Sequence, residues 1–341
     1  MDRLSLLDET LRAFDSSLPR VVSPRCVVTR YRASTCRSCV DVCPADALAL
    51  APLAVDADRC IACGACATVC RTGALDYPRS RSLVHGRLAE RSGDKAIIAC
   101  SQADLADAGM IANATIACLA GLSSADLITA AAAGLDGLVL VSGDCPGCPA
   151  GSAMAGAGPE DSPTAAWLSR IGVSLSLHRV TTTSNGEPVH PAAAPVSRRD
   201  LFGLLAGRGR EVAAAVLASS APRIEDLHAV TPPPAAHLRM LVDLENLASR
   251  VVVWRDVLPD DLPCASVEFA DGCDGCGLCV RYCPHGALML SEGLVAVDPR
   301  SCTGCGLCAE MCPREAVRLG PGSMPGLVTD TPVRESSSSQ G

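Results

Sequence analysis

Cysteine is the residue type whose spacing in this chain points most directly to chemistry. The 341 residues include 21 cysteines, whereas only 2% are aromatic. Near the C-terminus the chain reads CDGCGLCVRYCP and then CTGCGLCAEMCP, two copies of C-x2-C-x2-C-x3-C-P. Thiolate sulfur is a soft ligand that binds zinc, copper(I) and iron–sulfur clusters. So many regularly spaced thiols indicate a metal-based function that packing alone would not require.

The doubled run distinguishes iron–sulfur clusters from zinc. A structural zinc site takes four ligands from two C-x2-C pairs, whereas the doubled four-cysteine run here supplies eight thiols. In the bacterial ferredoxin run, three closely spaced cysteines bind one [4Fe-4S] cluster, and the fourth, before a proline, binds the neighbouring cluster. Two sites follow. Site 3 comprises Cys273, Cys276, Cys279 and Cys312. Site 4 comprises Cys283, Cys302, Cys305 and Cys308.

The segment between the two runs has the pattern of a β-hairpin. The apolar stretches ALML and LVAV flank the turn SEG, an arrangement typical of paired strands. Together with its cysteines, the region from about 264 to 320 resembles the two-cluster bacterial ferredoxins. The resemblance implies a small pseudo-symmetric fold that holds two [4Fe-4S] clusters.

A second copy of this unit lies near the N-terminus, so the chain contains an internal duplication. The connection between its two cysteine runs is two residues shorter, and Cys70 is followed by Arg71 instead of proline. Its cysteines match those of the C-terminal copy in the order Cys36, Cys39, Cys43, Cys60, Cys63, Cys66 and Cys70. Site 2 comprises Cys43, Cys60, Cys63 and Cys66.

One ligand of the N-terminal copy is missing, because Ala33 stands where the C-terminal copy has Cys273. Cys26 lies seven residues upstream of Ala33, beyond the segment VVTRY, which has the composition of a short strand. We expect Cys26 to fold back and supply the fourth thiolate. A three-iron cluster, a non-cysteine ligand and an empty site are the alternatives. Site 1 comprises Cys26, Cys36, Cys39 and Cys70.

Four further cysteines follow the expected strands of a small α/β domain. KAIIAC, ATIACLAG and DGLVLV read as strands, and SADLITAAAAG reads as a helix. Ser123 and Asp126 form a capping-box pattern at its start, and Gly134 ends it. This order predicts a parallel sheet, with ligands beyond the carboxyl ends of its strands. The cysteines expected there form the sheet-edge site, which comprises Cys100, Cys118, Cys145 and Cys148.

This middle stretch resembles the small iron–sulfur subunit domain that links hydrogenases or formate dehydrogenases to heterodisulfide-reductase-like complexes. The resemblance rests on IIACSQ and on IACLAGLSSADLITAAAAGLDGLVLVSGDCPGC, and it implies a [2Fe-2S] cluster at the sheet-edge site. It departs from that family because only two residues separate Cys145 from Cys148 and a usual histidine-bearing segment is absent. Thiol–disulfide exchange and inert buried thiols are the alternative interpretations. Cys264 has no expected role.

The remaining segments carry weaker signals. LFGLLAGRGREVAAAVLASS predicts an amphipathic helix within a Pro-, Ser- and Thr-rich linker. The preceding SRRDLF resembles a twin-arginine signal, and also a partner-contact segment of ferredoxin-type proteins of nitrate reductases. His285 is expected to be a turn residue, with hydrogen bonding to a cluster as the alternative. A group of four arginines beside module 1 is expected to lie on a solvated face, and docking of an acidic partner is the alternative. The group comprises Arg25, Arg30, Arg32 and Arg37.

The expected fold is α+β, with two ferredoxin-like dicluster modules flanking a small α/β domain that has a parallel sheet. The expected divisions are an N-terminal extension at 1–25, module 1 at 26–80, the α/β domain at 92–180, the linker at 181–262, module 2 at 263–320 and a disordered tail at 321–341.

Composition narrows the function. A net charge of −8 disfavours nucleic acid as a partner, and no apolar run reaches the ~18 residues of a membrane span. The N-terminus lacks a signal-peptide core, and so many thiols favour a reducing, cytoplasmic compartment. No glycine loop typical of nucleotide binding is present.

We therefore expect a non-catalytic electron-transfer subunit of an oxidoreductase complex. It would hold four [4Fe-4S] clusters and one [2Fe-2S] cluster, and its partners would be dehydrogenase, hydrogenase or reductase subunits. The alternative is a ferredoxin-type accessory or maturation protein for a molybdo- or related oxidoreductase.

Overall fold

The structure is a computed structural model that describes residues 18–77, 84–88, 94–154, 158–183, 229–250 and 257–322. Three sequence predictions lie outside these residues. They are the amphipathic helix, the SRRDLF segment and the disordered tail beyond residue 322.

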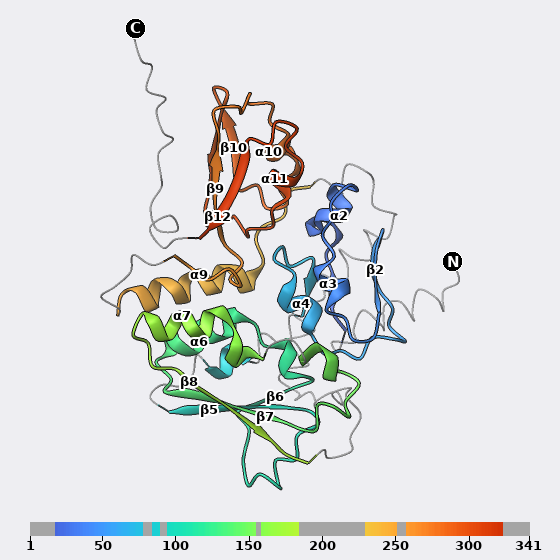
Figure 1. The fold of residues 1–341 in the computed structure, drawn as a ribbon, viewed down its shortest axis with the longest axis vertical. Helices are drawn as coiled ribbons and strands as arrows, with labels where there is room; N and C mark the ends of the chain where they lie inside the picture. Colours follow the sequence, from blue (N-terminus) through green and yellow to red (C-terminus); the bar gives the residue numbers. More distant parts are fainter. Residues whose placement is uncertain are drawn as a thin grey trace, which may run out of the picture.

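Module 2 is built on two antiparallel strand pairs, drawn in orange and red in Figure 1. β9 (Ala265–Phe269) pairs with β12 (Val317–Pro321), and β10 (Leu288–Ser291) pairs with β11 (Leu294–Val297). The second pair confirms the hairpin predicted between the two cysteine runs. β9 precedes the first cysteine run and β12 follows the second, whereas β10 and β11 connect the two runs, so the strands fix where both runs start and end.

Two short helices follow the first cysteines of the two runs in module 2. α10 (Leu278–Tyr282) begins after Gly277, and α11 (Leu307–Glu310) begins after Gly306. Both glycines have left-handed backbone conformations, with φ of 72° and 80°. Residues with a Cβ adopt this region only at a cost, so glycine allows each run to turn sharply into its helix.

Module 1 repeats this plan with shorter strands. β1 (Arg20–Val21) pairs antiparallel with β4 (Leu75–Asp76), and β2 (Leu48–Leu50) forms a hairpin with β3 (Leu53–Val55). β1 precedes residue 26, where the sequence placed the start of this module. The repeated pairing pattern is the structural counterpart of the duplication in the sequence.

The helices of module 1 follow the same order, with one addition. α3 (Ser38–Asp41) and α4 (Ala65–Val69) correspond to the two helices of module 2. Between β1 and α3 lie the additional 3-10 helix η1 (Ser23–Arg25) and the helix α2 (Val27–Arg30).

The strand predicted for VVTRY is therefore wrong, because this segment is helical. The amide of Arg30 donates to the carbonyl of Cys26 at 3.0 Å, and that of Tyr31 donates to the carbonyl of Val27 at 2.8 Å. Val27 and Val28 are buried in the core of the module. Burial of these side chains overrides the strand preference of β-branched residues, which is a weak and context-dependent one.

The α/β region contains a four-stranded parallel sheet with the order β6-β5-β7-β8. Its strands are β5 (Lys95–Cys100), β6 (Ala114–Ile116), β7 (Gly137–Ser142) and β8 (Ser176–Thr181). All three neighbouring pairs run parallel, which confirms the predicted parallel sheet. The structure contains both helices and strands, which agrees with the expected α+β class.

Helices cover one face of this sheet (Figure 1). α6 (Ser124–Ala133) has the predicted capping box, in which the Ser123 amide donates to the Asp126 carboxylate at 2.8 Å. α7 (Pro163–Arg170) lies beside α6. α9 (Ala235–Ala248), in the region expected as a linker, packs on α6 with four buried apolar side chains. These are Met240, Leu241, Leu244 and Leu247.

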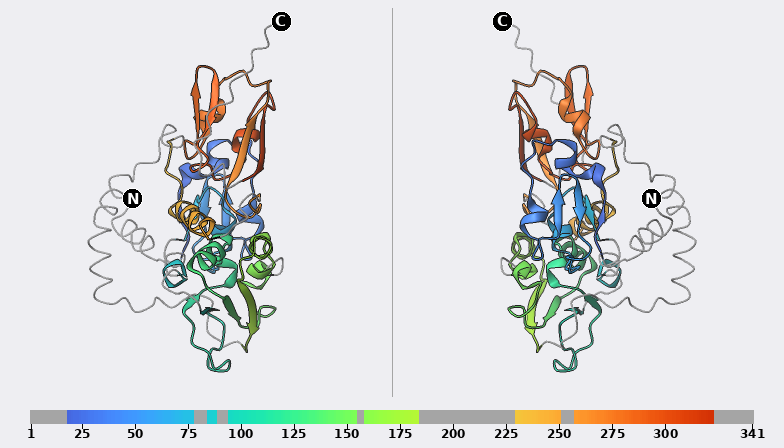
Figure 2. Two further views of the ribbon diagram at one scale, coloured as in Figure 1. Left: turned by 90° about the vertical axis from the view of Figure 1, so that its left-hand side faces the viewer. Right: turned by 90° about the vertical axis from the view of Figure 1, so that its right-hand side faces the viewer.

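The three parts are stacked along the long axis of the molecule. Figure 2 shows module 1, in blue, between module 2 and the sheet of the α/β region. The connections between strands and helices of the α/β region contain short 3-10 helices, among them η2 (Leu119–Gly121), η3 (Gly151–Met154) and η4 (Pro159–Asp161). Among the residues that the structure describes, no helix combines the length and apolar character that a membrane crossing demands.

Candidate iron–sulfur sites

Three of the four-cysteine sets in the modules each line a small cavity. All four cysteines of site 2, of site 3 and of site 4 face their own cavity, and each cavity has a volume of about 20 Å³. Cysteines that lie far apart in sequence, such as Cys43 and Cys66 of site 2, are brought to one place. This crossing between the two runs is the arrangement that the ferredoxin pattern predicts.

The four cysteines of site 1, with Cys26 among them, also lie near one another. Cys26 is 7% exposed and lies at the N-cap of α2. Burial, followed by the nearby charges of Cys70, Cys26 and Cys36, raises the pKa of Cys39 to about 12. The four predicted members of site 1 are therefore neighbours.

The chemistry of these sets fits a positively charged, multi-atom group. Burial raises the pKa of Cys305 and of Cys308 to about 12 and also raises that of Cys66. Thiolates in such surroundings need a cationic partner, which iron supplies. In the described part of the chain, no group of three or more His, Cys, Asp or Glu side chains is arranged to hold a single metal ion. The sulfurs of a set instead surround a cavity.

Backbone amides also point at sulfur in both modules. The amide of Ala47 donates to Cys43 Sγ, and the amide of Ala287 donates to Cys283 Sγ, each at 3.3 Å. Both cysteines precede a proline at matching places of the duplication. Hydrogen bonds to sulfur are among the features that set the potential of an iron–sulfur cluster.

Two residues that line the cavity of site 4 each have a buried polar atom without a hydrogen-bond partner among the described residues. The two atoms are Oγ1 of Thr303, which is 2% exposed, and Nε2 of His285, which is 5% exposed. His285 Nδ1 donates to the Thr231 carbonyl at 3.2 Å, and burial lowers the pKa of His285 to about 4. The Thr303 hydroxyl needs an acceptor, which the sulfur atoms of a cluster would supply.

The sheet-edge site is assembled at the carboxyl ends of the parallel strands. Its four cysteines line one cavity, again of about 20 Å³. Cys100 is the last residue of β5, and the Gly143 amide donates to its sulfur at 3.4 Å. Burial, and then the charges of Cys63, Cys100 and Cys148, raise the pKa of Cys118 to about 12. The predicted convergence on this edge is thus present.

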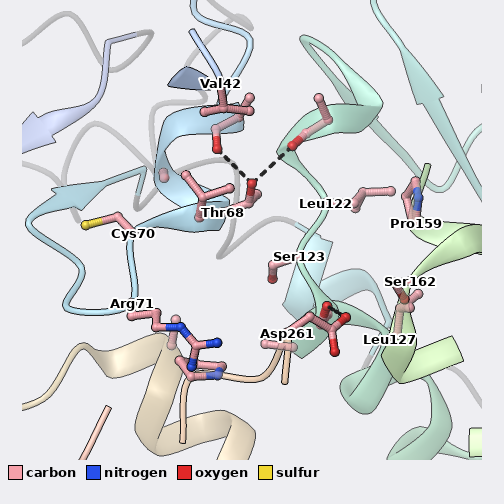
Figure 3. Close-up of a pocket in the computed structure, with 18 of the residues that line it drawn as sticks. Val42, Thr68, Cys70, Arg71, Leu122, Ser123, Leu127, Pro159, Ser162 and Asp261 are labelled. Carbon is pink, nitrogen blue, oxygen red and sulfur yellow. Dashed lines mark hydrogen bonds between the residues drawn. The ribbon is translucent and has the colours of Figure 1, made fainter. Parts of the chain in front are cut away.

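The sheet-edge site and site 2 are close neighbours. Cys63 of site 2 belongs to the same buried core as Cys100 and Cys118. A methyl group added to Gly121 would lie 3.1 Å from the Cys63 carbonyl oxygen. The Thr68 hydroxyl of α4 donates to the Ala65 carbonyl at 2.8 Å and reaches the Ala120 carbonyl of η2 at 3.4 Å (Figure 3). Module 1 therefore contacts the α/β region beside two cysteine sets.

Within each module the two sites are also adjacent. The pKa of Cys66 in site 2 is raised mainly by burial and then by the other thiols of site 2. The charge of Cys39 in site 1 adds a smaller contribution. In module 2, Cys279 of site 3 contributes in the same way to the raised pKa of Cys308 in site 4. The helices that carry these cysteines also pack on each other, α3 on α4 in module 1 and α10 on α11 in module 2. Each module therefore holds a closely spaced pair of sites.

A larger cavity of about 430 Å³ lies where module 1, α6, α7 and the segment before β9 meet. Arg71 donates to the Leu262 carbonyl at 3.0 Å and to the Asp260 carbonyl. Asp261 accepts hydrogen bonds from Ser124 and Thr164. Figure 3 shows Arg71 and Asp261 along its wall. Because these side chains bind other parts of the chain, they hold module 1, the α/β region and the segment before β9 together. Of the cysteines of the five sites, Cys70 alone lines this cavity.

Two residues differ from the sequence interpretation. Arg30, expected on a solvated face, is 3% exposed. Arg25 donates to the carbonyls of Gly73 and Pro232, so it also binds the chain itself. Backbone carbonyls leave no signal in a sequence, and these partners could not have been foreseen.

Cys264, for which no role was expected, is buried, and its pKa is raised to about 12 by burial, with Cys302 of site 4 nearby.

Comparison with known protein families matches three segments of the chain. Residues 272–316 match a 4Fe-4S dicluster domain, and residues 53–76 and 34–47 each match a 4Fe-4S binding domain. No curated protein and no solved structure was found to match the chain. The matched segments include every cysteine of sites 2, 3 and 4, but neither Cys26 nor the sheet-edge site. The chain is thus an iron–sulfur protein with ferredoxin-type [4Fe-4S] domains in both modules.

Proposed function

We propose that this chain is an electron-transfer protein or subunit that relays single electrons between a dehydrogenase- or hydrogenase-type oxidoreductase and another redox partner. One [4Fe-4S] cluster is assigned to each of sites 1 to 4, with Cys26 as the fourth ligand of site 1. The proposal keeps the boundaries of module 1 and module 2 that were expected from the sequence. It also assigns the protein to the reducing cytoplasm, where thiols stay available for metal.

The observation that carries the proposal is the succession of cysteine sets along the molecule. Site 3 neighbours site 4 within module 2, and site 1 neighbours site 2 within module 1. Site 2 in turn neighbours the sheet-edge site. A relay needs such a succession, because a single electron must find an acceptor close by at every step.

When bound, a [4Fe-4S] cluster takes up or releases one electron at a time, at a potential set by hydrogen bonds, burial and charge. The chain supplies the first two of these influences at the sites themselves. The amides of Ala47 and Ala287 donate to sulfur, and Cys39 and Cys279 are buried.

The sheet-edge site is assigned an iron–sulfur cluster of its own. Four converging cysteines and the position beyond the parallel strands support this assignment. The resemblance to the hydrogenase-linked subunit domain favours a [2Fe-2S] cluster, whereas thiol–disulfide exchange would involve only Cys145 and Cys148. Changing both to serine separates these readings: loss of about two iron atoms per chain supports a [2Fe-2S] cluster, and unchanged iron with loss of a dithiol titration supports exchange.

The first experiment is anaerobic purification of the full chain, with iron and sulfide counted and the reduced protein measured by EPR. About 16 iron atoms per chain are expected from four [4Fe-4S] clusters, and about two more from the sheet-edge site. Iron well under half of that amount, or the absence of any reducible signal, would refute the proposal.

Anaerobic pull-down of the native protein tests its partners. A stable stoichiometric complex with an active oxidoreductase is expected. Release once the enzyme has received its cofactor would instead identify an accessory or maturation protein.

A further inference from the structure

The contact between the two modules centres on the buried Arg30 of module 1. Its Nε donates to the Tyr282 carbonyl at 2.7 Å, and its Nη2 donates to the Cys283 carbonyl at 3.1 Å, both in module 2. Its Nη1 donates to the carbonyls of Pro24 at 2.8 Å and Ala229 at 3.0 Å. One guanidinium therefore joins three separate segments of the chain.

Burial of this charge requires compensation. Carbonyl oxygens satisfy the hydrogen bonds of Arg30 but carry no net charge, and a buried cation is costly unless an anion lies near it. Burial lowers the pKa of Arg30, while the nearby thiolates of Cys283 and Cys305 oppose that shift. Both thiols belong to site 4, so the negative charge of this site offsets the buried guanidinium.

Site 1 lies on the other side of the same contact. Arg30 ends α2, and Cys26 of site 1 is the N-cap of that helix. Cys26 and Cys39 share one buried apolar cluster with Leu307 of module 2, and Cys305 of site 4 packs against it. Sites 1 and 4 thus lie on either side of a single core.

A second contact holds the modules together. The Glu310 carboxylate at the end of α11 accepts hydrogen bonds from the Ser34 hydroxyl at 2.6 Å and the Thr35 hydroxyl at 3.0 Å. The Thr35 amide donates to the same carboxylate. Ser34 and Thr35 directly precede Cys36 of site 1, so this contact also fixes site 1 relative to module 2.

We propose that this contact is the internal electron-transfer junction between the modules, and that Arg30 is its positioning residue. Arg30 holds site 1 against site 4, and its charge raises the reduction potential of site 4. The inference rests on the proposed function. One electron lost at one of these sites is gained at the other, and no bond forms or breaks and no proton moves. Since reduction makes site 4 more negative, a fixed positive charge beside it stabilises the reduced state.

The test uses the full chain, purified anaerobically with its clusters, in an EPR-monitored redox titration. The variants are Arg30→Gln, which removes the charge, and Arg30→Lys, which keeps it. Arg37→Gln is the matched control, because Arg37 is also an arginine beside site 1 but is exposed and pairs with Asp41 at 3.4 Å. The signals of site 4 are assigned with a variant that lacks Cys302 and Cys305.

Arg30→Gln is expected to shift the midpoint potential of site 4 to a more negative value and to weaken the spin coupling between sites 1 and 4. The potentials of sites 2 and 3 should not change. Arg30→Lys should restore most of the potential but not the coupling, because an ammonium cannot donate in the four directions that Arg30 uses. Arg37→Gln should leave the potential of site 4 and the spin coupling between sites 1 and 4 unchanged.

An unchanged site 4 potential and unchanged coupling in Arg30→Gln would overturn the inference and leave the proposed function intact. A uniform shift of all potentials would also overturn it, because that result indicates a general structural role. If Arg30→Gln does not fold, wild-type coupling in Arg30→Lys overturns the positioning role. Absence of reducible clusters in the unmodified protein would instead refute the proposed function.

Discussion

The two modules share one plan but differ at the start of their first site. In module 2, Cys273 follows β9 closely, and Gly277 with φ of 72° begins α10. In module 1, Ala33 and Arg37 occupy those two places, and Arg37 has φ of −130°. Cys26, which lies just before the inserted α2, is the residue that we propose as the replacement ligand, and it shares a buried cluster with Cys39, against which Cys70 packs. The comparison teaches that a helical turn inserted before a tight loop brings an upstream cysteine close to the remaining members of the set.

The second sites of the modules differ in the polarity of their cavities. His285 and Thr303 line site 4, whereas Ala45 and Ile61 occupy the matching positions in site 2. The Thr303 hydroxyl can donate to a cluster and Ile61 cannot. We therefore expect site 4 to have a more positive reduction potential than site 2.

The largest effect is expected from Cys26→Ala. If Cys26 completes site 1, this variant should lose about four iron atoms per chain or retain a three-iron cluster. Iron analysis and EPR measure the outcome, and Cys264→Ala, another buried cysteine, is the control that should keep its iron. Adding Ala33→Cys to the Cys26→Ala variant recreates the arrangement of module 2. Full iron content in Cys26→Ala would show that the missing ligand comes from elsewhere.

The next effect concerns Gly64 and Gly306, which precede α4 and α11 with φ of 82° and 80°. Alanine at either position costs about 1 kcal/mol or more from the left-handed backbone. A Cβ on Gly64 would also lie 3.3 Å from the Gly121 Cα, whereas a Cβ on Gly306 meets nothing within 4 Å. Gly64→Ala should therefore lower the free energy of unfolding more than Gly306→Ala. Equal losses in denaturant titrations would contradict the tight contact at Gly64.

A smaller effect is expected from exchanging the side chains of the two second sites. Thr303→Ile should make the potential of site 4 more negative, and Ile61→Thr should make that of site 2 more positive. Each change is read by redox titration, with the unaltered site in the same protein as the control. Opposite signs would show that the cavity lining does not set the difference.

The smallest effect is expected at Glu310. Burial alone would raise its pKa, but hydrogen bonds from Ser34 and Thr35 lower it below the usual 4.5. A lowered carboxylate pKa means that this contact stabilises the folded state above pH 4.5 and is lost as the pH falls through the lowered value. Because Glu310 is exposed, Glu310→Gln should cost less than about 1 kcal/mol at neutral pH. A larger loss, measured in denaturant, would contradict the small contribution expected from an exposed carboxylate.

The sequence predicted the features that local chemistry determines. Cysteine spacing gave the members of the sets, and the hairpin between Leu288 and Val297 and the capping box of Ser123 followed from short patterns. The features that it missed depend on tertiary contacts. VVTRY is helical because Val27 and Val28 are buried, and α9 could be recognised only by its packing on α6. Arg30 binds carbonyls, which have no sequence signature.

Thr68 and Glu310 occupy the same position in the duplicated module, at the second helix of each copy. Thr68 reaches the Ala120 carbonyl beside the sheet-edge site, and Glu310 reaches Ser34 and Thr35 beside site 1. Each module thus contacts its neighbour through the same position of its second helix: module 1 contacts the α/β region, and module 2 contacts module 1. The duplication therefore repeats the position of a contact as well as a fold, because the second helix of each copy faces the neighbouring unit of the chain.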